Sequence, residues 1–304
     1  MRRVALALVF VMLLALFASG CISGGHGESG GSTTTASSHS PSSSITSPTT
    51  SSVTTQTSTT PWTTTQEVTS TTSTFRPSPA EDVMGILDSI SSYRAEILTT
   101  LNSSVSVTSG GSVRVENVSV FSNTSAFFDL DDGEMDVNMS ILTYPAGGNT
   151  TVRIVLIGDD AFVNSMGTWR HLKRGSDGFD AVFSVFKYNP LSLVGNALSS
   201  GLCNVTGSEG SFKVECSGVE EDFLNLIKTT VGAPQNSKVS VSSPRISLEI
   251  SGGRIISGEL VVGFEISKNP GEESWFLNQV GTVREEFKIL GINEDLDLSP
   301  PEGG

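Results

Sequence analysis

The stretch DGEMDVNMSI, residues 132–141, decides the fold of this chain. Its opening Asp132-Gly133 pair is a strong signal for a tight turn between two antiparallel strands. After the turn, Met135, Val137, Met139 and Ile141 alternate with polar residues. Successive side chains of a strand point to opposite faces, so this alternation predicts a strand with one apolar and one solvated face.

The same alternation recurs on both sides of this stretch. It appears earlier in Tyr93, Ala95 and Ile97, and just afterwards in Val152, Ile154 and Leu156. Near the C-terminus a Gly252-Gly253 turn separates two further runs, which are Ile246, Leu248, Ile250 and then Ile256, Leu260, Val262, Phe264, Ile266. Strands that are dry on one face only are typical of antiparallel sheets. We therefore expect a long antiparallel meander.

Helical signals stand at the start and in the middle of the folded part. Ser78, Pro79 and Glu81 form a capping box with proline at the first helical position. Asn189-Pro190 and Ser217 with Glu220 mark the starts of two central helices. The predicted fold class is α+β. In it, a strongly curved antiparallel sheet, or half-barrel, has its apolar concave face covered by N-terminal and central helices.

The first residues have the layout of a secretory signal. Arg2 and Arg3 precede an apolar run of 14 residues, 4–17, which ends in small residues before Cys21. A membrane-spanning helix needs roughly 20 apolar residues, so we expect residues 1–20 to be a cleaved signal peptide. The cysteine resembles the lipobox cysteine of prokaryotic lipoproteins, which takes a lipid. The alternatives are an ordinary signal peptide with an incidental cysteine and an uncleaved anchor.

The remainder divides into a tether and one domain. Between residues 32 and 74, 31 of 43 residues are Ser or Thr. Such a segment buries too little apolar surface to offset its chain entropy. We expect residues 21–78, which begin with the lipidated cysteine, to be a disordered tether, and residues 79–304 to form the folded domain. That domain would stand on the extracytoplasmic side of the cell membrane.

Charge and cysteine content agree with export. The domain has 15 basic and 30 acidic residues, and such a negative surface repels phosphate backbones, so nucleic acid is not an expected partner. Cys203 and Cys216 flank a turn signal, Gly207-Ser208-Glu209-Gly210. In an oxidising compartment this pair predicts a disulfide. A two-cysteine metal site is the alternative, but it lacks further ligands.

The order of these elements resembles a known family. A helix, a long meander, central helices and closing strands, over about residues 79–304, are similar to the LolA-like fold, which is shared with the LppX and LprG group of lipid-handling lipoproteins. Ala161-Phe162-Val163-Asn164 with Gly167-Thr168-Trp169, Asn189-Pro190-Leu191, and the segment from Ile292 to Pro301 resemble short motifs of that family. Arg170-His171 after the tryptophan departs from its pattern. The resemblance implies an apolar cavity between sheet and helices.

Catalytic and metal-binding motifs are hard to find in this chain. His171 is the domain's only histidine, and neither a glycine-rich phosphate loop nor an HExxH motif occurs. Residues 129–134 superficially suggest calcium, but their glycine is one place too early for an EF-hand loop. We therefore expect no enzyme, no cofactor and no metal, and interpret residues 129–134 as a solvated hairpin tip.

Six Asn-x-Ser/Thr sequons exceed the two or three expected by chance. They begin at Asn102, Asn117, Asn123, Asn138, Asn149 and Asn204, and each is a candidate N-glycosylation site. A composition rich in Ser and Thr is the alternative origin of some of them. Sequons together with a lipobox indicate an archaeal-type surface lipoprotein.

Two functions are compatible with these sequence features. The first is a lipid-anchored extracytoplasmic protein that holds an acyl or isoprenoid lipid in a cavity. Its wall would be Met135, Val137, Met139, Ile154, Leu156, Leu248, Leu260, Val262 and Phe264. The second is a protein-interaction or scaffold module with a filled core and a membrane-protein partner. A hollow or a filled concave face distinguishes the two.

Overall fold

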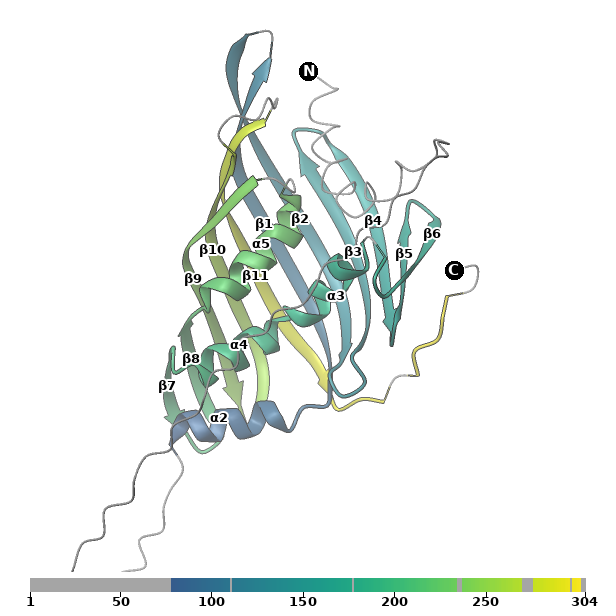
Figure 1. Ribbon diagram of the computed structural model, residues 1–304. Coiled ribbons are helices and arrows are strands. Elements are labelled where there is room, and N and C mark those ends of the chain that lie inside the picture. Colours follow the sequence, from purple (N-terminus) through teal and green to yellow (C-terminus); the bar gives the residue numbers. More distant parts are fainter. Residues whose placement is uncertain are drawn as a thin grey trace, which may run out of the picture. The chain divides into compact units, whose positions relative to one another are not determined.

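The computed structural model describes residues 78–109, 111–176, 178–233, 237–269, 276–295 and 297–301 (Figure 1). The predicted signal peptide, Cys21 and the predicted tether up to residue 77 lie outside the described residues. The folded residues form one large antiparallel sheet with helices packed on one of its faces.

The sheet has eleven strands in the order β6-β5-β4-β3-β2-β1-β11-β10-β9-β8-β7. The strands are β1 (Ser92–Ser109), β2 (Ser112–Asp129), β3 (Glu134–Tyr144), β4 (Gly148–Ile157), β5 (Asp160–Ser165), β6 (Thr168–Lys173), β7 (Cys203–Ser208), β8 (Ser211–Ser217), β9 (Ser237–Ser251), β10 (Arg254–Lys268) and β11 (Phe276–Ile292). The first and last strands pair in the middle, with Thr99 opposite Glu285. Two meanders are thereby joined into one curved sheet, which confirms the predicted α+β fold class.

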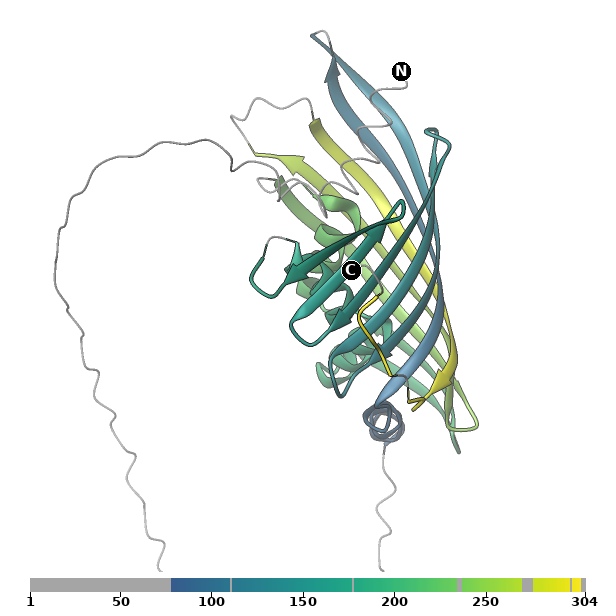
Figure 2. The same ribbon diagram turned by 90° about the vertical axis from the view of Figure 1, so that its right-hand side faces the viewer.

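The helices lie on one face of the sheet and at one end of it. They are α2 (Pro79–Asp88), α3 (Phe179–Lys187), α4 (Pro190–Ser199), α5 (Glu220–Ile227) and the π-helical turn η2 (Lys228–Gly232). Helices α3, α4 and α5 cross in front of the strands in Figure 1, and the side view in Figure 2 places them on one side of the sheet. Helix α2 packs against β7 and α4. Among the described residues, no helix combines the length and apolar character needed to cross a membrane.

The predicted caps are confirmed for two helices and wrong for the third. The Ser78 hydroxyl accepts the Glu81 N–H, and the Ser78 N–H donates to the Glu81 carboxylate, which completes the capping box of α2. Asn189 caps α4. Ser217 instead ends strand β8, where its N–H donates to the Leu202 carbonyl, and α5 begins only at Glu220. Helix α3 was not predicted.

The predicted alternation of side chains is confirmed in β3 and shifts near the start of β10. Met135 and Val137 of β3 are buried, whereas Asn138 is exposed. In β10, however, Ile255 is buried and Ile256 is exposed, opposite to the prediction. A bulge between Ile255 and Ser257 shifts the register against β9 and exchanges the faces of the residues before it.

Candidate ligand pocket

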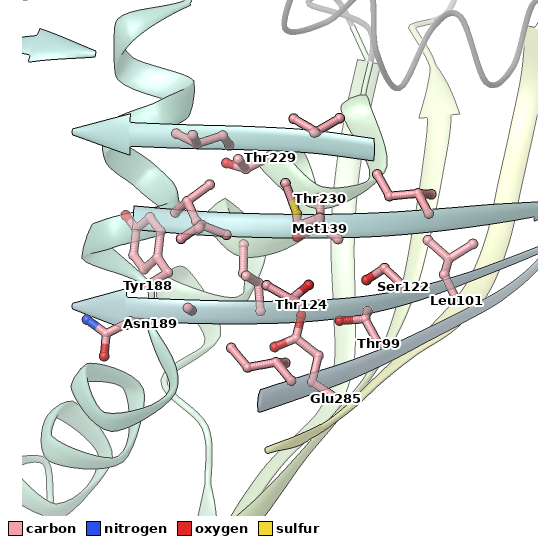
Figure 3. A pocket seen from close by; sticks show the side chains of 18 of the residues that line it. Thr99, Leu101, Ser122, Thr124, Met139, Tyr188, Asn189, Thr229, Thr230 and Glu285 are labelled. Carbon is pink, nitrogen blue, oxygen red and sulfur yellow. The ribbon is translucent and has the colours of Figure 1, made fainter. Parts of the chain in front are cut away.

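A hollow of about 210 Å³ lies between the inner face of the sheet and the helices. Its floor is made by β1, β2, β3, β4 and β11, and its roof by α3, the turn into α4, the end of α5, and η2 (Figure 3). The roof residues are Ser184, Val185, Tyr188, Asn189, Pro190, Leu226, Thr229 and Thr230. Protein interiors are normally close-packed, with few voids larger than a water molecule. The hollow therefore shows that the concave face is only partly filled.

The floor consists of rows of side chains that cross the strands in register. One row runs through Leu101 and Val120, and another through Ile97, Met139 and Val152, with Thr124 between Ile97 and Met139. Most of these side chains are apolar. They present a surface on which a hydrocarbon chain finds contacts comparable to those of a protein core.

A polar row crosses the middle of this apolar floor. Glu285 of β11 stands opposite Thr99 of β1, which in turn stands opposite Ser122 of β2. The close-up in Figure 3 labels all three side chains on the floor of the pocket. Among the described residues that line the pocket, Glu285 is the only acidic or basic one.

The environment of Glu285 changes its protonation. Desolvation raises the pKa of this carboxyl from the ordinary 4.5 to about 7, although a hydrogen bond with Thr99 lowers it in part. Burial in apolar surroundings disfavours the charged form of an acid. The carboxyl is therefore divided between its charged and neutral forms near neutral pH.

Hydrogen bonds between buried or half-buried groups hold the roof above this floor. The Tyr93 hydroxyl donates to Asn189 Oδ1 at 2.7 Å, and Asn189 Nδ2 donates to the Phe186 carbonyl at 2.7 Å. Asn225 of α5 donates to the Tyr188 hydroxyl at 3.0 Å. These bonds link the turn between α3 and α4 to β1, and they link α5 to that turn.

The residues predicted to line a cavity divide into two groups. Val137, Met139 and Ile154 line the pocket. The other six are buried in the core without lining it; these are Met135, Leu156, Leu248, Leu260, Val262 and Phe264. Helices α4 and α5 pack against β9, the strand that contains Leu248. Met135 and Leu156 instead belong to β3 and β4, two strands of the pocket floor.

Glu285, the charged residue of the lining, was not predicted from the sequence. The signal was present in β11, where Val283, Glu285, Phe287 and Ile289 alternate with Arg284, Glu286 and Lys288. A carboxyl at an apolar position of such an alternation is costly to bury. It would have marked Glu285 as a candidate functional residue.

Cys203 and Cys216 form a disulfide between facing positions of β7 and β8. The bond closes the hairpin that the turn signal predicted, and it lies away from the pocket lining. Its sequence separation of 13 residues corresponds to about 3 kcal/mol in the chain-entropy model.

All six sequon asparagines are exposed. Five of them, Asn102, Asn117, Asn123, Asn138 and Asn149, lie on β1 to β4 at positions that alternate with the inner ones. Asn102 accepts from Ser119, and Asn117 accepts from Ser104, at 2.7 and 2.8 Å. The outer face of this half of the sheet thus carries a ladder of asparagine and serine side chains.

His171 and the acidic hairpin tip make local surface contacts. His171 Nε2 lies 2.6 Å from Asp160 Oδ1, and its ring stacks on Phe162. Asp129 Oδ1 accepts the N–H groups of Asp131 and Asp132, which shapes the turn before β3. Within the part of the chain that the structure describes, no three His, Cys, Asp or Glu side chains group as a metal site.

Comparisons with known proteins give a distant likeness. No family model and no curated protein matches this chain. Among solved structures, LprF from Mycobacterium bovis is similar with 9% identity over 73% of this chain and 95% of that chain, at a TM-score of 0.34.

Two further solved structures are similar at lower scores. A β-barrel-like protein of the domain of unknown function DUF1849 from Brucella abortus has 10% identity over 66% of this chain and 98% of that chain, at a TM-score of 0.23. A DUF1329 family protein from Desulfovibrio piger has 12% identity over 73% of this chain and 93% of that chain, at a TM-score of 0.20. Scores this low carry no argument about function, which has to come from the pocket itself.

Proposed function

We propose that this protein is a lipid-anchored extracytoplasmic protein that binds a hydrophobic ligand, an acyl or isoprenoid chain, between its sheet and its helices. The observation that carries the proposal is the hollow under α3 and the α3–α4 turn, with its largely apolar floor. The resemblance of the sequence to lipid-handling lipoproteins supports the same function. The N-terminal lipid on Cys21 would hold the domain at the membrane from which such a ligand comes.

The size of the hollow restricts the ligand. Sites for drug-sized molecules usually enclose roughly 300 to 1,000 Å³, and this pocket has about 210 Å³. One slender chain fits such a space better than a lipid with several chains. We therefore expect a single-chain ligand, or one chain of a larger lipid.

Native mass spectrometry and uptake of a fluorescent single-chain lipid would test this function. Replacing Ile141, which lines the pocket, by Trp should fill the hollow and abolish uptake. The matched control is Leu142→Trp, because Leu142 is the next residue, faces outward and is 42% exposed. No uptake by the unmodified protein, or equal loss in both variants, would contradict the proposal.

A protein-interaction module is the second candidate, and the outer face supplies the observation that favours it. Leu98, Phe121 and Leu142 are exposed there and line a common shallow groove. A membrane-protein partner that docks on this groove should be lost from pull-downs with Phe121→Ser. Lipid uptake should be unchanged by the same substitution, so the two functions are separable.

A further inference from the structure

We propose that the pocket selects amphiphiles with an uncharged or positively charged head group that donates a hydrogen bond to Glu285. Long-chain alcohols and amines have such head groups. The inference rests on the proposed function, since it presupposes that a hydrocarbon chain enters the pocket. It adds a polar contact point and a preferred chemistry to that chain-binding site.

The position of Glu285 in the sheet carries this inference. Its neighbours on the adjacent strands are Thr99 and Leu260, and neither is charged. The adjacent Arg284 faces the outer side, where it binds Glu259 and Glu286 at 2.7 and 2.8 Å. Among the described lining residues, none is a cation that could pair with the Glu285 carboxyl.

The hydrogen-bonding capacity of the carboxyl leaves room for a ligand. An ionised carboxylate has about four acceptor positions, and Thr99 supplies one hydrogen bond. The side chains of Ser122 and Thr124 extend the polar surface beside it (Figure 3). An incoming ammonium or hydroxyl group would thus meet acceptors within an otherwise apolar floor.

The negative charge of an ionised Glu285 favours some ligand head groups over others. An unpaired carboxylate in apolar surroundings is costly, and an opposite charge nearby relieves that cost. A ligand carboxylate or phosphate would instead bring a second negative charge beside Glu285, with no lining cation among the described residues to offset it. Tyr188 is the other titratable residue of the lining, and its hydroxyl accepts from Asn225. Lys187 and Lys228 on the roof elements are exposed and do not line the pocket.

Binding of three ligands with the same chain would test the inference. Dodecylamine, dodecanol and dodecanoate are titrated below their micellar concentrations at pH 8, against purified full-length protein. We expect dodecylamine to bind about tenfold tighter than dodecanoate, with dodecanol between them, as one close charge interaction of modest strength would give. In Glu285→Gln, which keeps an acceptor for Thr99, amine and carboxylate should differ by no more than about twofold.

The control and the outcomes separate this inference from the function on which it rests. Glu286→Gln changes the adjacent outward carboxylate and should keep the preference of the unmodified protein. If no ligand binds, the proposed function fails. If all three bind equally, chain binding stands and the head-group inference is overturned. Equal loss of preference in both variants would also overturn it, because it would indicate a general effect of net charge.

Discussion

Tyr93 connects the sheet to the helix layer through one buried hydrogen bond. Its side chain is fully buried, its hydroxyl binds Asn189, and its ring stacks on Phe128 at 5.0 Å. Burial raises the pKa of Tyr93 well above its ordinary value, so the hydroxyl stays a donor. The roof of the pocket depends on this contact, because Asn189 stands at the turn between α3 and α4.

Tyr93→Phe should lower the free energy of unfolding by about 1 to 2 kcal/mol. The ring contacts survive, whereas a buried acceptor on Asn189 loses one of its partners. Denaturant unfolding measures the change. The control is Tyr144→Phe, since Tyr144 is 63% exposed, and it should stay within about 0.5 kcal/mol of the unmodified protein. Equal effects would contradict the structural role of the Tyr93 hydroxyl.

Glu285 should make stability depend on pH. Its pKa is about 7 in the folded state and 4.5 ordinarily, so between these values the folded state binds more protons than the unfolded state. The contribution of this group to the free energy of unfolding therefore decreases as pH rises through that window. Because Glu285 is only half-buried, we expect a decrease of roughly 1 to 3 kcal/mol in the free energy of unfolding.

Unfolding of the unmodified protein and of Glu285→Gln from pH 4.5 to 8 measures this contribution. The stability difference between the two should change across the window and stay constant above about pH 8. Glu286→Gln, on the outer face, should keep the pH profile of the unmodified protein. Parallel profiles for Glu285→Gln and the unmodified protein would show that Glu285 titrates as an ordinary surface carboxyl.

At the scale of elements, Gly258 is a position where a neighbouring strand's backbone and a side chain both lie close to the chain. A Cβ at residue 258 would lie 2.2 Å from the Phe287 ring and 2.4 Å from the Ser247 carbonyl oxygen. Phe287 stands opposite Gly258 in the pairing of β10 with β11, and its ring occupies the missing side chain's place. The gap in the apolar alternation of β10 is thereby filled from the neighbouring strand.

Gly258→Ala should destabilise the protein by about 1 to 3 kcal/mol, because a backbone carbonyl has to move as well as a ring. Gly85→Ala in helix α2 is the matched control. No atom lies within 4 Å of a Cβ at residue 85, so alanine there should be neutral or stabilise by up to about 1 kcal/mol. Thermal unfolding of the two variants tests this prediction. If Gly258→Ala is as stable as the unmodified protein, β10 and β11 separate easily at this position, and the close contact does not constrain them.

Helix caps and strand alternation could be predicted from the sequence because each depends only on residues nearby in the chain. The cap of α2 at Ser78 and that of α4 at Asn189 each depend on residues within one turn. The period-two patterns of β3 and β9 likewise need only the pleat of a strand. These features follow from the sequence around them, and the curved antiparallel sheet followed from their sum.

Features set by distant contacts could not be predicted in this way. Ser217 is a residue type that favours helix caps, but it is the last residue of β8 and pairs with Arg245 of β9, so α5 begins three residues later, at Glu220. The bulge that turns Ile256 outward depends on the register with β9. The pairing of β1 with β11 joins residues almost two hundred positions apart, and whether the roof leaves a hollow depends on how α3 and α5 pack. The sequence therefore left a hollow and a filled concave face as alternatives, and three of the nine residues named for a cavity wall, Val137, Met139 and Ile154, line the pocket.

The outer face also shows why the sequons were ambiguous. A strand with a polar face rich in Asn and Ser places serine two residues after asparagine by its period alone. Ser140 donates to Asn149, as Ser104 does to Asn117, so some sequons serve as hydrogen-bonded ladders. Both roles remain compatible, because these bonds use Oδ1 and a glycan attaches through Nδ2.

At the scale of the whole molecule, the charge of the domain and the lipid that we propose on Cys21 together bear on how the protein would be held at a membrane. The chain has a net charge of −14, and an anionic bilayer repels such a domain. We therefore expect no electrostatic attraction to contribute to membrane retention. If the protein is anchored, hydrophobic insertion has to supply the whole free energy, and Cys21 is the residue that we propose carries the lipid.

Cys21→Ser should therefore release the protein from membranes or leave the signal uncleaved. A single acyl chain of myristoyl length gives only marginal binding, so stable anchoring requires two hydrophobic signals, which a lipoprotein's two-chain lipid would supply. Because no charge contact contributes, molar salt should release none of the unmodified protein. Membrane fractionation with mass analysis of the N-terminus tests both points. Retention of a processed Cys21→Ser protein, or release of the unmodified protein by salt, would mean that a contact other than this lipid holds the domain.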